Sequence, residues 1–244
     1  MLGIVIPAHD EEACLPGCLA ALHAAATHPR LHGEPVLIHV VLDDCGDGSE
    51  DILKRWQLRH RDARVTLSYS QIDKRKVGAA RASGADRLLR QGVRWLAFTD
   101  ADTRVSPEWL VQQLALGVDV VCGSVAVDDW SPHAGHAALL RTHFSEHYND
   151  RDGHRHIHGA NMGVAADAYI KAGGFEPVPC HEDVYLVAAL ERIGARFAWS
   201  AAPRVVTSAR TDARARGGFG DYMLNVIATA AAGTANCHPA ENAS

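Results

Sequence analysis

VRWLAFTDADT, residues 93–103, is the stretch that decides the fold. Val93 to Thr99 form a mostly apolar run, which predicts a buried strand, and the run stops at Asp100-Ala101-Asp102. Acids directly after a buried strand lie at the carboxyl edge of a sheet, where α/β proteins bind their ligands. The stretch therefore predicts an α/β protein with its functional residues at one edge of the sheet.

The sequence before this stretch repeats the same arrangement of strand and helix. Apolar runs predict strands, and the segments between them predict helices. The strands are expected at Leu2–Ile6, Val36–Leu42 and Arg64–Tyr69, and the helices at Glu11–Ala26, Glu50–Arg61 and Val77–Gln91. This alternation predicts a mostly parallel central sheet flanked by helices.

The second half of the chain is less regular. It predicts a strand at 118–127, a helix at 134–148 and a helix at 182–193. Residues 230–244 are small and polar, so we expect a flexible C-terminal tail there. The rest of the chain, residues 1–229, is expected to form a single domain.

Composition excludes several classes of protein. Of the 244 residues, 47% are hydrophobic and 22% charged, which is ordinary for a globular protein. The net charge of −5 provides no basic field that would favour nucleic acid. The sequence has no transmembrane segment, because no apolar stretch approaches the ~20 residues that a spanning helix needs. Six scattered cysteines without a C-x-x-C pair favour thiols in a reducing compartment, so we expect a cytoplasmic location.

Asp100 and Asp102 are candidate metal ligands. Two carboxylates on alternate residues can converge on one hard cation such as Mg²⁺ or Mn²⁺, with diphosphate oxygens completing its coordination. D-x-D is common, and a turn with solvated acids is the alternative. The buried strand that precedes the motif favours the metal site, because it fixes both acids at the active edge of the sheet.

A second acidic loop follows the strand expected at 36–42. A carboxylate of Asp43 or Asp44 at this position can accept hydrogen bonds from a nucleobase or from ribose hydroxyls. The alternative is an Asx turn that caps the next helix. That alternative accounts for Asp47 and Ser49 but leaves Asp43 available for a ligand.

Two further motifs carry charge. Basic residues 74–76 stand beside Gly78 and Arg81 at an expected helix start, where they could hold a diphosphate. A solvated charge run is the equal alternative. Later in the chain, Glu182 and Asp183 open another expected helix, so one of them could act as a general base. Capping of the first helical turn is the alternative for this pair.

Histidines form two groups. His143 and His147 are four residues apart on an expected helix, whereas His154, His156 and His158 alternate and would share one face of an extended chain. A zinc site is the weaker interpretation, because no cysteine or acid motif at zinc spacing accompanies them. Polar residues of an acceptor site, or exposed loop histidines, are the favoured interpretations.

Taken in order, these motifs resemble the family 2 glycosyltransferases, which are inverting enzymes of the GT-A fold. The resemblance covers about residues 1–215 and rests on seven landmarks. They are Ile4–Glu12 for I-P-x-x-N-E-E, Asp43–Ser49 for D-x-x-x-D-x-S/T, Gly78–Gly84 for G-x-x-x-A-R-N-x-G, Asp100–Asp102 for D-x-D, Gly159–Met162 for G-x-N-M, Gly173–Phe175 for G-G-F, and Glu182–Leu186 for E-D-x-x-L.

The resemblance implies a metal-dependent transfer of a sugar from a UDP- or GDP-type donor to a hydroxyl acceptor. Residues 1–103 would form the nucleotide-sugar-binding half and residues 104–229 the acceptor-binding half. Asp102, with Asp100, would ligate the divalent cation, and Asp183 would be the base with Glu182 beside it. The donor would contact Pro7, Ala8, Glu12, Asp43, Asp44, Gly78, Arg81, Asp100 and Ala101. Asp43 would face the nucleobase, and Arg81 would approach the diphosphate.

Two other functions remain open at this point. A sugar-nucleotide nucleotidyltransferase would also gather acids around a metal, but it usually begins with a glycine-rich basic loop, where this chain has residues 7–12. A non-catalytic sugar-nucleotide binder has no reason to keep both Asp102 and Asp183. Arg210, Arg214 and Arg216 could hold phosphate as a lid closes, with a solvated basic tail as the alternative. A lipid acceptor would have to be reached by peripheral contact with the membrane.

Overall fold

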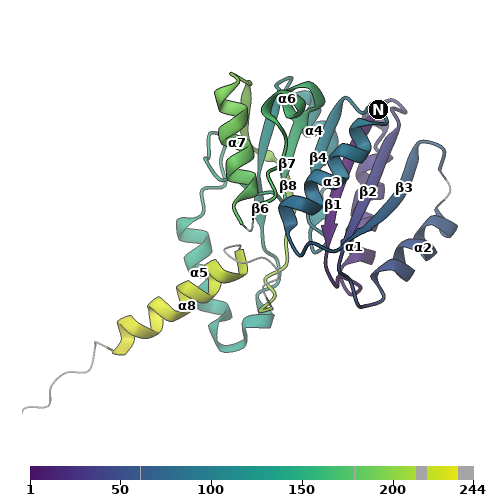
Figure 1. Ribbon diagram of the computed structural model, residues 1–244. Helices are drawn as coiled ribbons and strands as arrows, with labels where there is room; N and C mark the ends of the chain where they lie inside the picture. The colour runs from purple at the N-terminus through teal and green to yellow at the C-terminus, as the bar shows by residue number, and fades with distance from the viewer. Residues whose placement is uncertain (61, 179, 213–218, 236–244) are drawn as a thin grey trace, which may run out of the picture. The chain divides into compact units, whose positions relative to one another are not determined.

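The computed structural model describes residues 1–60, 62–178, 180–212 and 219–235 (Figure 1). The chain divides into two compact units. The sheet unit comprises Met1–Asp128 and Asn149–Ser208, and the helical unit comprises Asp129–Tyr148 and the described residues from Ala209 onward. The domain boundary expected at residue 229 stays a prediction.

The sheet unit is built on one eight-stranded sheet with the order β3-β2-β1-β4-β7-β6-β8-β5 (Figure 1). The strands are β1 Leu2–Ala8, β2 Val36–Asp43, β3 Val65–Ile72, β4 Trp95–Phe98, β5 Arg104–Val105, β6 Val120–Ala126, β7 Met162–Ala165 and β8 Phe197–Val206. Strands β3, β2, β1 and β4 are parallel. Strand β7 runs antiparallel to both of its neighbours, and β5 antiparallel to β8. The predicted mostly parallel α/β sheet is confirmed.

Strand register brings the acidic loops to one edge of the sheet. Ala8 of β1 pairs with Leu42 of β2, and Val5 of β1 pairs with Phe98 of β4. Because β7 is antiparallel, its first residue, Met162, pairs with Phe98, the last residue of β4. The residues after β2, the residues after β4 and the residues before β7 therefore meet at the same edge.

Helices cover the sheet in two groups, seen in Figure 1. Helix α7 contacts both α3 and α6, and α1 contacts both α2 and α4. Their bounds are α1 Leu15–Ala26, η1 Pro29–Leu31, α2 Ser49–Arg59, α3 Val77–Leu89, α4 Trp109–Ala115, α6 Ala166–Ala172 and α7 Glu182–Arg192. The expected helices are present, with ends that differ by a few residues.

A buried apolar cluster joins α3, α6 and α7 to the sheet. Its members include Leu88 of α3, Phe98 of β4, Tyr169 of α6 and Leu190 of α7. Helix α3 lies against β1 at a glycine, because a Cβ atom at Gly84 would stand 2.5 Å from Val5 Cγ1. This close contact holds the middle of α3, three residues after Arg81, against the sheet.

The helical unit contains η2 Ser131–His136, α5 Ala137–His147 and α8 Phe219–Ala235. Helix α5 contacts both of the others, and Phe144 packs edge-on against Phe219 with ring centroids 5.9 Å apart. Helix α8 includes residues 230–235, where a flexible tail was expected, and residues 236–244 lie outside the described part. Within the described ranges, no helix combines the length and apolar character needed to cross a bilayer.

Candidate functional site

Two loops at the edge of the sheet are joined by backbone-to-carboxylate hydrogen bonds. Gly46 N donates to Asp10 Oδ1 at 2.6 Å, and Gly48 N donates to Glu12 Oε2 at 2.6 Å. In return, Glu12 N donates to Asp47 Oδ2 at 2.9 Å. These bonds hold the chain after β1 in a non-helical path, so α1 begins at Leu15 rather than at Glu11 as predicted.

Asp47 also makes the Asx turn that the sequence suggested. Ser49 N donates to Asp47 Oδ1 at 3.0 Å, at the start of α2. The Ser49 hydroxyl is buried and accepts a hydrogen bond from Glu11 N at 2.9 Å. Asp47 and Ser49 are therefore structural, and the residues left for a ligand are those nearer to β2.

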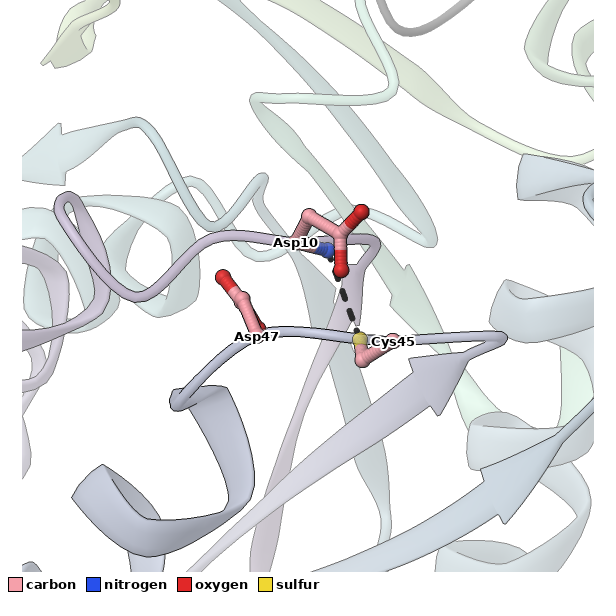
Figure 2. Close-up of side chains that lie close together, drawn as sticks. All are labelled: Asp10, Cys45 and Asp47. Carbon is pink, nitrogen blue, oxygen red and sulfur yellow. Dashed lines mark hydrogen bonds between the residues drawn. The ribbon is translucent and has the colours of Figure 1, made fainter.

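Asp10, Cys45 and Asp47 gather at the junction of these loops (Figure 2). Among the described residues they form the one group of three potential metal ligands whose atoms lie within 4.8 Å of one another. Asp10 N donates to Cys45 Sγ at 3.4 Å, and that thiol donates to the Ala8 carbonyl at 3.3 Å. Burial raises the pKa of Cys45, which keeps the thiol protonated. A protonated thiol and carboxylates that already accept backbone N–H groups describe a loop junction rather than a metal site.

Asp43 is buried at the end of β2 and organises the basic loop that precedes α3. Its Oδ1 accepts from Lys74 N at 2.7 Å and Arg75 N at 2.9 Å, and its Oδ2 accepts from Lys76 N at 2.9 Å. Oδ2 accepts only one of these bonds and can accept a second, so a contact with a ligand remains compatible with this arrangement. The nucleobase contact stays a prediction.

Asp43→Ala is expected to lower the free energy of unfolding by about 1–3 kcal/mol, because three backbone N–H groups lose a buried acceptor. Urea denaturation of the variant and the parent measures this change. Asp44→Ala is the control, since Asp44 is partly exposed and pairs with the exposed Arg75. Equal midpoints for Asp43→Ala and the parent would contradict a role in holding residues 74–76.

The other residues predicted to contact the donor lie at strand ends or in a contact between two helices. Pro7 and Ala8 end β1, and Ala101 is buried between the two acids of the D-x-D. Gly78 lies in the first turn of α3, where an added Cβ would stand 2.9 Å from Glu182 Cβ. Gly78 therefore serves the contact between α3 and α7, and its contact with the donor stays a prediction.

Arg81 joins the D-x-D to the E-D pair. One of its terminal nitrogens donates to Asp100 Oδ1 at 2.5 Å, and the other donates to Glu182 Oε1. Arg81 is 3% exposed, and its Nε is buried without a hydrogen-bond partner. Burial alone would lower the pKa of Arg81, but the nearby carboxylates, led by Asp100, hold it above its ordinary value. Burial raises the pKa of Glu182, and the Arg81 guanidinium opposes that rise.

Asp183 lies beside this junction in the first turn of α7. Its Oδ2 accepts a hydrogen bond from Gly159 N at 2.9 Å, and its Oδ1 accepts one from Val184 N at 2.9 Å. The carboxylate is therefore oriented by the turn before β7 as well as by its own helix. Asp183 is partly exposed, unlike the buried Glu182.

Asp102 is partly exposed at the same edge, after β4. The hydroxyl of Thr103 donates to Asp102 Oδ1 at 3.3 Å and lies 3.0 Å from the hydroxyl of Thr207. Burial raises the pKa of the Cys18 thiol, and the negative charge of Asp102 is the second largest cause of this rise. The predicted metal ligand is thus partly accessible to solvent, as binding of a cation requires. Of the late arginines, Arg210 belongs to the helical unit, and Arg214 and Arg216 lie outside the described residues.

Asn161, from the G-x-N-M landmark, has a structural role that the sequence did not reveal. The side chain is fully buried and accepts a hydrogen bond from Trp109 Nε1 at 2.8 Å. Its amide donates to the carbonyl oxygens of Ser124, at 2.7 Å, and Pro203. Asn161 therefore ties together α4, β6 and β8 behind the turn. Buried polar side chains of this kind become visible only when their distant partners are known.

His154, His156 and His158 form a row of stacked rings, and the charge of Asp183 acts on the last of them, His158. The ring centroids are 5.5 Å apart between the first two and 5.8 Å apart between the last two. His154 Nδ1 accepts from His156 N at 3.2 Å, and its Nε2 donates to the Ser200 carbonyl at 3.3 Å. Both nitrogens of His154 are thus engaged by the backbone, which opposes a zinc site there. Burial, with His156 next in effect, lowers the pKa of His158 to about 4.

Comparison with known proteins adds a family and a fold. The model of the family described as Glycosyl transferase family 2 matches residues 3–172. No curated protein sequence matches the chain.

The five cysteines within the described ranges, at positions 14, 18, 45, 122 and 180, are free thiols, and Cys237 lies outside those ranges.

Two solved structures have a similar fold. Residues 1–349 of S. aureus TarS, in complex with UDP-GlcNAc, align with a TM-score of 0.62 and 14% identity over 93% of this chain. The chain spans 65% of that structure, slightly less than two thirds. The mannosyltransferase PcManGT from Pyrobaculum calidifontis, in complex with GDP-Man and Mn²⁺, aligns with a TM-score of 0.61 and 17% identity over 97% of this chain and 75% of its own. At these identities the similarity establishes the fold.

Proposed function

Because the chain belongs to glycosyl transferase family 2, we propose that it transfers a sugar from a nucleoside-diphosphate donor to a hydroxyl acceptor. The family model covers residues 3–172 of the 244. The observation that carries the proposal is the junction at Arg81, where Asp100 of the D-x-D and Glu182 of the E-D pair meet the same guanidinium. Donor-side and acceptor-side acids of one reaction need this proximity.

The donor is proposed to be a UDP- or GDP-sugar. TarS was solved with UDP-GlcNAc and PcManGT with GDP-Man, and both have the fold of this chain. The nucleoside would lie over the loops that follow β1 and β2, with Asp43 toward its base. The other residues proposed to contact the donor from these loops are Pro7, Ala8, Glu12 and Asp44. The loops are joined to each other by hydrogen bonds, so this surface is preorganised, which lowers the entropic cost of binding.

A divalent cation, Mg²⁺ or Mn²⁺, is the proposed cofactor. The residues fit such an ion, because Asp102 and Asp100 offer the hard carboxylate oxygens that these cations prefer. Asp102 is the main proposed ligand, since the negative charge of Asp100 is already paired with the guanidinium of Arg81. When bound, the cation neutralises the negative charge that develops on the leaving diphosphate. PcManGT was solved with Mn²⁺.

Asp183 is the proposed general base. The acceptor oxygen would form a bond to the anomeric carbon while the bond from that carbon to the diphosphate oxygen breaks. The proton of the acceptor hydroxyl would pass to Asp183, and attack opposite the leaving group would invert the anomeric configuration. Support comes from the orientation of Asp183 by Gly159 N and Val184 N, and from its partial exposure.

Two alternatives follow from the sequence. A nucleotidyltransferase is disfavoured by the family match over residues 3–172. A non-catalytic nucleotide-sugar binder would keep the donor loops, but it would have no use for an Asp183 held by two backbone N–H groups. The cytoplasmic location and the peripheral contact with a membrane-bound acceptor are further proposals that follow from the sequence.

A thermal-shift panel tests the proposed function. UDP, GDP and their common sugars, each with and without Mn²⁺, should raise the unfolding temperature, because a ligand that binds only the folded state stabilises it. One nucleotide is expected to give the largest metal-dependent shift, and its sugar then serves as donor in transfer assays with hydroxyl acceptors. No shift with any nucleotide would contradict the proposal. A shift without turnover would favour the binder.

A further inference from the structure

Arg81 belongs to α3 and is buried against α7 and the turn before β7. Asp100 and Glu182 each accept a hydrogen bond from one of its terminal nitrogens. The ring of Phe175 lies 5.9 Å from the guanidinium carbon. Gly159 also packs on the guanidinium, because a Cβ atom at Gly159 would stand less than 3.0 Å from three guanidinium atoms. The guanidinium is thus in close contact with protein on each of these sides.

This packing does not suit a residue that binds the donor's diphosphate. A phosphate-binding arginine presents two N–H groups to the ligand. In Arg81 both terminal nitrogens are paired with carboxylates, and its Nε is buried. Because the residue is 3% exposed, a diphosphate could reach it only if these carboxylates moved away. The guanidinium therefore has no accessible face for a diphosphate. This speaks against the expectation from the sequence that Arg81 approaches the diphosphate.

The same packing makes Arg81 a spacer between the two halves of the site. On one side it holds Asp100, the second proposed ligand of the cation, two residues before the main proposed ligand Asp102. On the other side it holds Glu182, the residue before the proposed base Asp183. Gly159 packs on the guanidinium and also donates its N–H to Asp183. A displacement of Arg81 would therefore reach Asp183 by two routes, through Glu182 and through Gly159.

We propose that Arg81 is a positioning residue, which sets the separation between the D-x-D and the base Asp183 without contacting the donor. The inference rests on the proposed function. Arginine suits this role because its planar guanidinium can bond two carboxylates at a fixed separation, which the single ammonium of lysine cannot. Misplacement of a reacting group by about 1 Å can lower a rate by about 10²-fold.

Gly159→Ala is the sharpest test, because the added methyl group pushes on the guanidinium while no charged group is removed. We expect the transfer rate to fall by about 10²-fold. The KM for the donor and the affinity for UDP or GDP should stay within about threefold, because no donor contact is removed. Gly17→Ala is the matched control, since a Cβ at the exposed Gly17 of α1 would make only an ordinary contact of 3.8 Å with Arg104.

Two substitutions of Arg81 extend the test. Arg81→Lys keeps the charge and should retain more activity than Arg81→Met, with both below the parent. Titration calorimetry with UDP and UMP, and with GDP and GMP, in the presence of Mn²⁺, supplies a readout that needs no turnover. If Arg81 is a positioning residue, the ratio of diphosphate to monophosphate affinity is the same in the Arg81→Lys variant and the parent.

A fall of about tenfold or more in that ratio would overturn the inference and would make Arg81 a diphosphate-binding residue. An undiminished transfer rate in Gly159→Ala would overturn it as well. Should Arg81→Met fail to fold, Arg81→Lys and Gly159→Ala still decide the question. Failure of the parent to bind any nucleotide would instead contradict the proposed function, so the two failures are distinguishable.

Discussion

Asp183→Asn is expected to lower the transfer rate by about 10²–10⁴, the usual contribution of a positioned general base. Asparagine has nearly the same size as aspartate but cannot accept a proton at neutral pH. Its side-chain oxygen can still accept one of the two backbone N–H groups that Asp183 binds, those of Gly159 and Val184. The rate with an identified donor and acceptor measures the effect, and thermal unfolding verifies that the variant is folded.

The donor should bind Asp183→Asn with an affinity within about threefold of that of the parent, because a base acts on the acceptor. Asp167→Asn is the matched control, since Asp167 is an exposed acid in the first turn of another helix, α6. That control should transfer sugar at the parental rate. Transfer at an undiminished rate in Asp183→Asn would remove Asp183 from the role of base.

Asp102→Ala is expected to abolish metal-dependent binding of the donor and to leave the fold intact. The reason is that Asp102 is a partly exposed acid after β4, outside the apolar core. Titration calorimetry with UDP plus Mn²⁺, and with GDP plus Mn²⁺, measures the change. Asp128→Ala serves as control, because Asp128 is an exposed acid that follows β6 and pairs with Arg104. Metal-dependent binding that persists undiminished in Asp102→Ala would show that the cation has other ligands.

The sequence predicted the first half of the fold well, because its strands are marked by local patterns of apolar residues. Strands β1, β2 and β4 are apolar runs that end at proline or acids, so both their type and their functional edge could be inferred. Strands β7 and β8 and helix α6 were not predicted. Strand β5 has only two residues, Arg104 and Val105, and pairs with β8, about 100 positions later. A two-residue strand has no periodicity that a sequence could reveal.

The types of residue in the site could be predicted, but not their contacts. The sequence singled out Asp43, Arg81 and Glu182 as functional candidates. It could not show that Asp43 holds the backbone of residues 74–76, or that Arg81 bonds Glu182, which is 101 positions away. The contact between Arg81 and Glu182 is set by the packing of α3 on α7, which depends on small residues such as Gly78. Contacts over these distances are properties of the tertiary structure.

The reversed direction of β7 has a consequence for how this architecture can diversify. The chain leaves the sheet at the end of β6, Ala126, and rejoins it at Met162, which pairs with the last residue of β4. Both attachment points belong to strands that are already hydrogen-bonded to their neighbours. Residues 129–148 of this connection belong to the helical unit and take part in none of these strand pairings, so they can be lengthened, shortened or exchanged while residues 149–161, with Gly159 and Asn161, are kept. In an evolving lineage, this position allows a module to be replaced while the strands that present Asp43 and Asp100 are inherited unchanged.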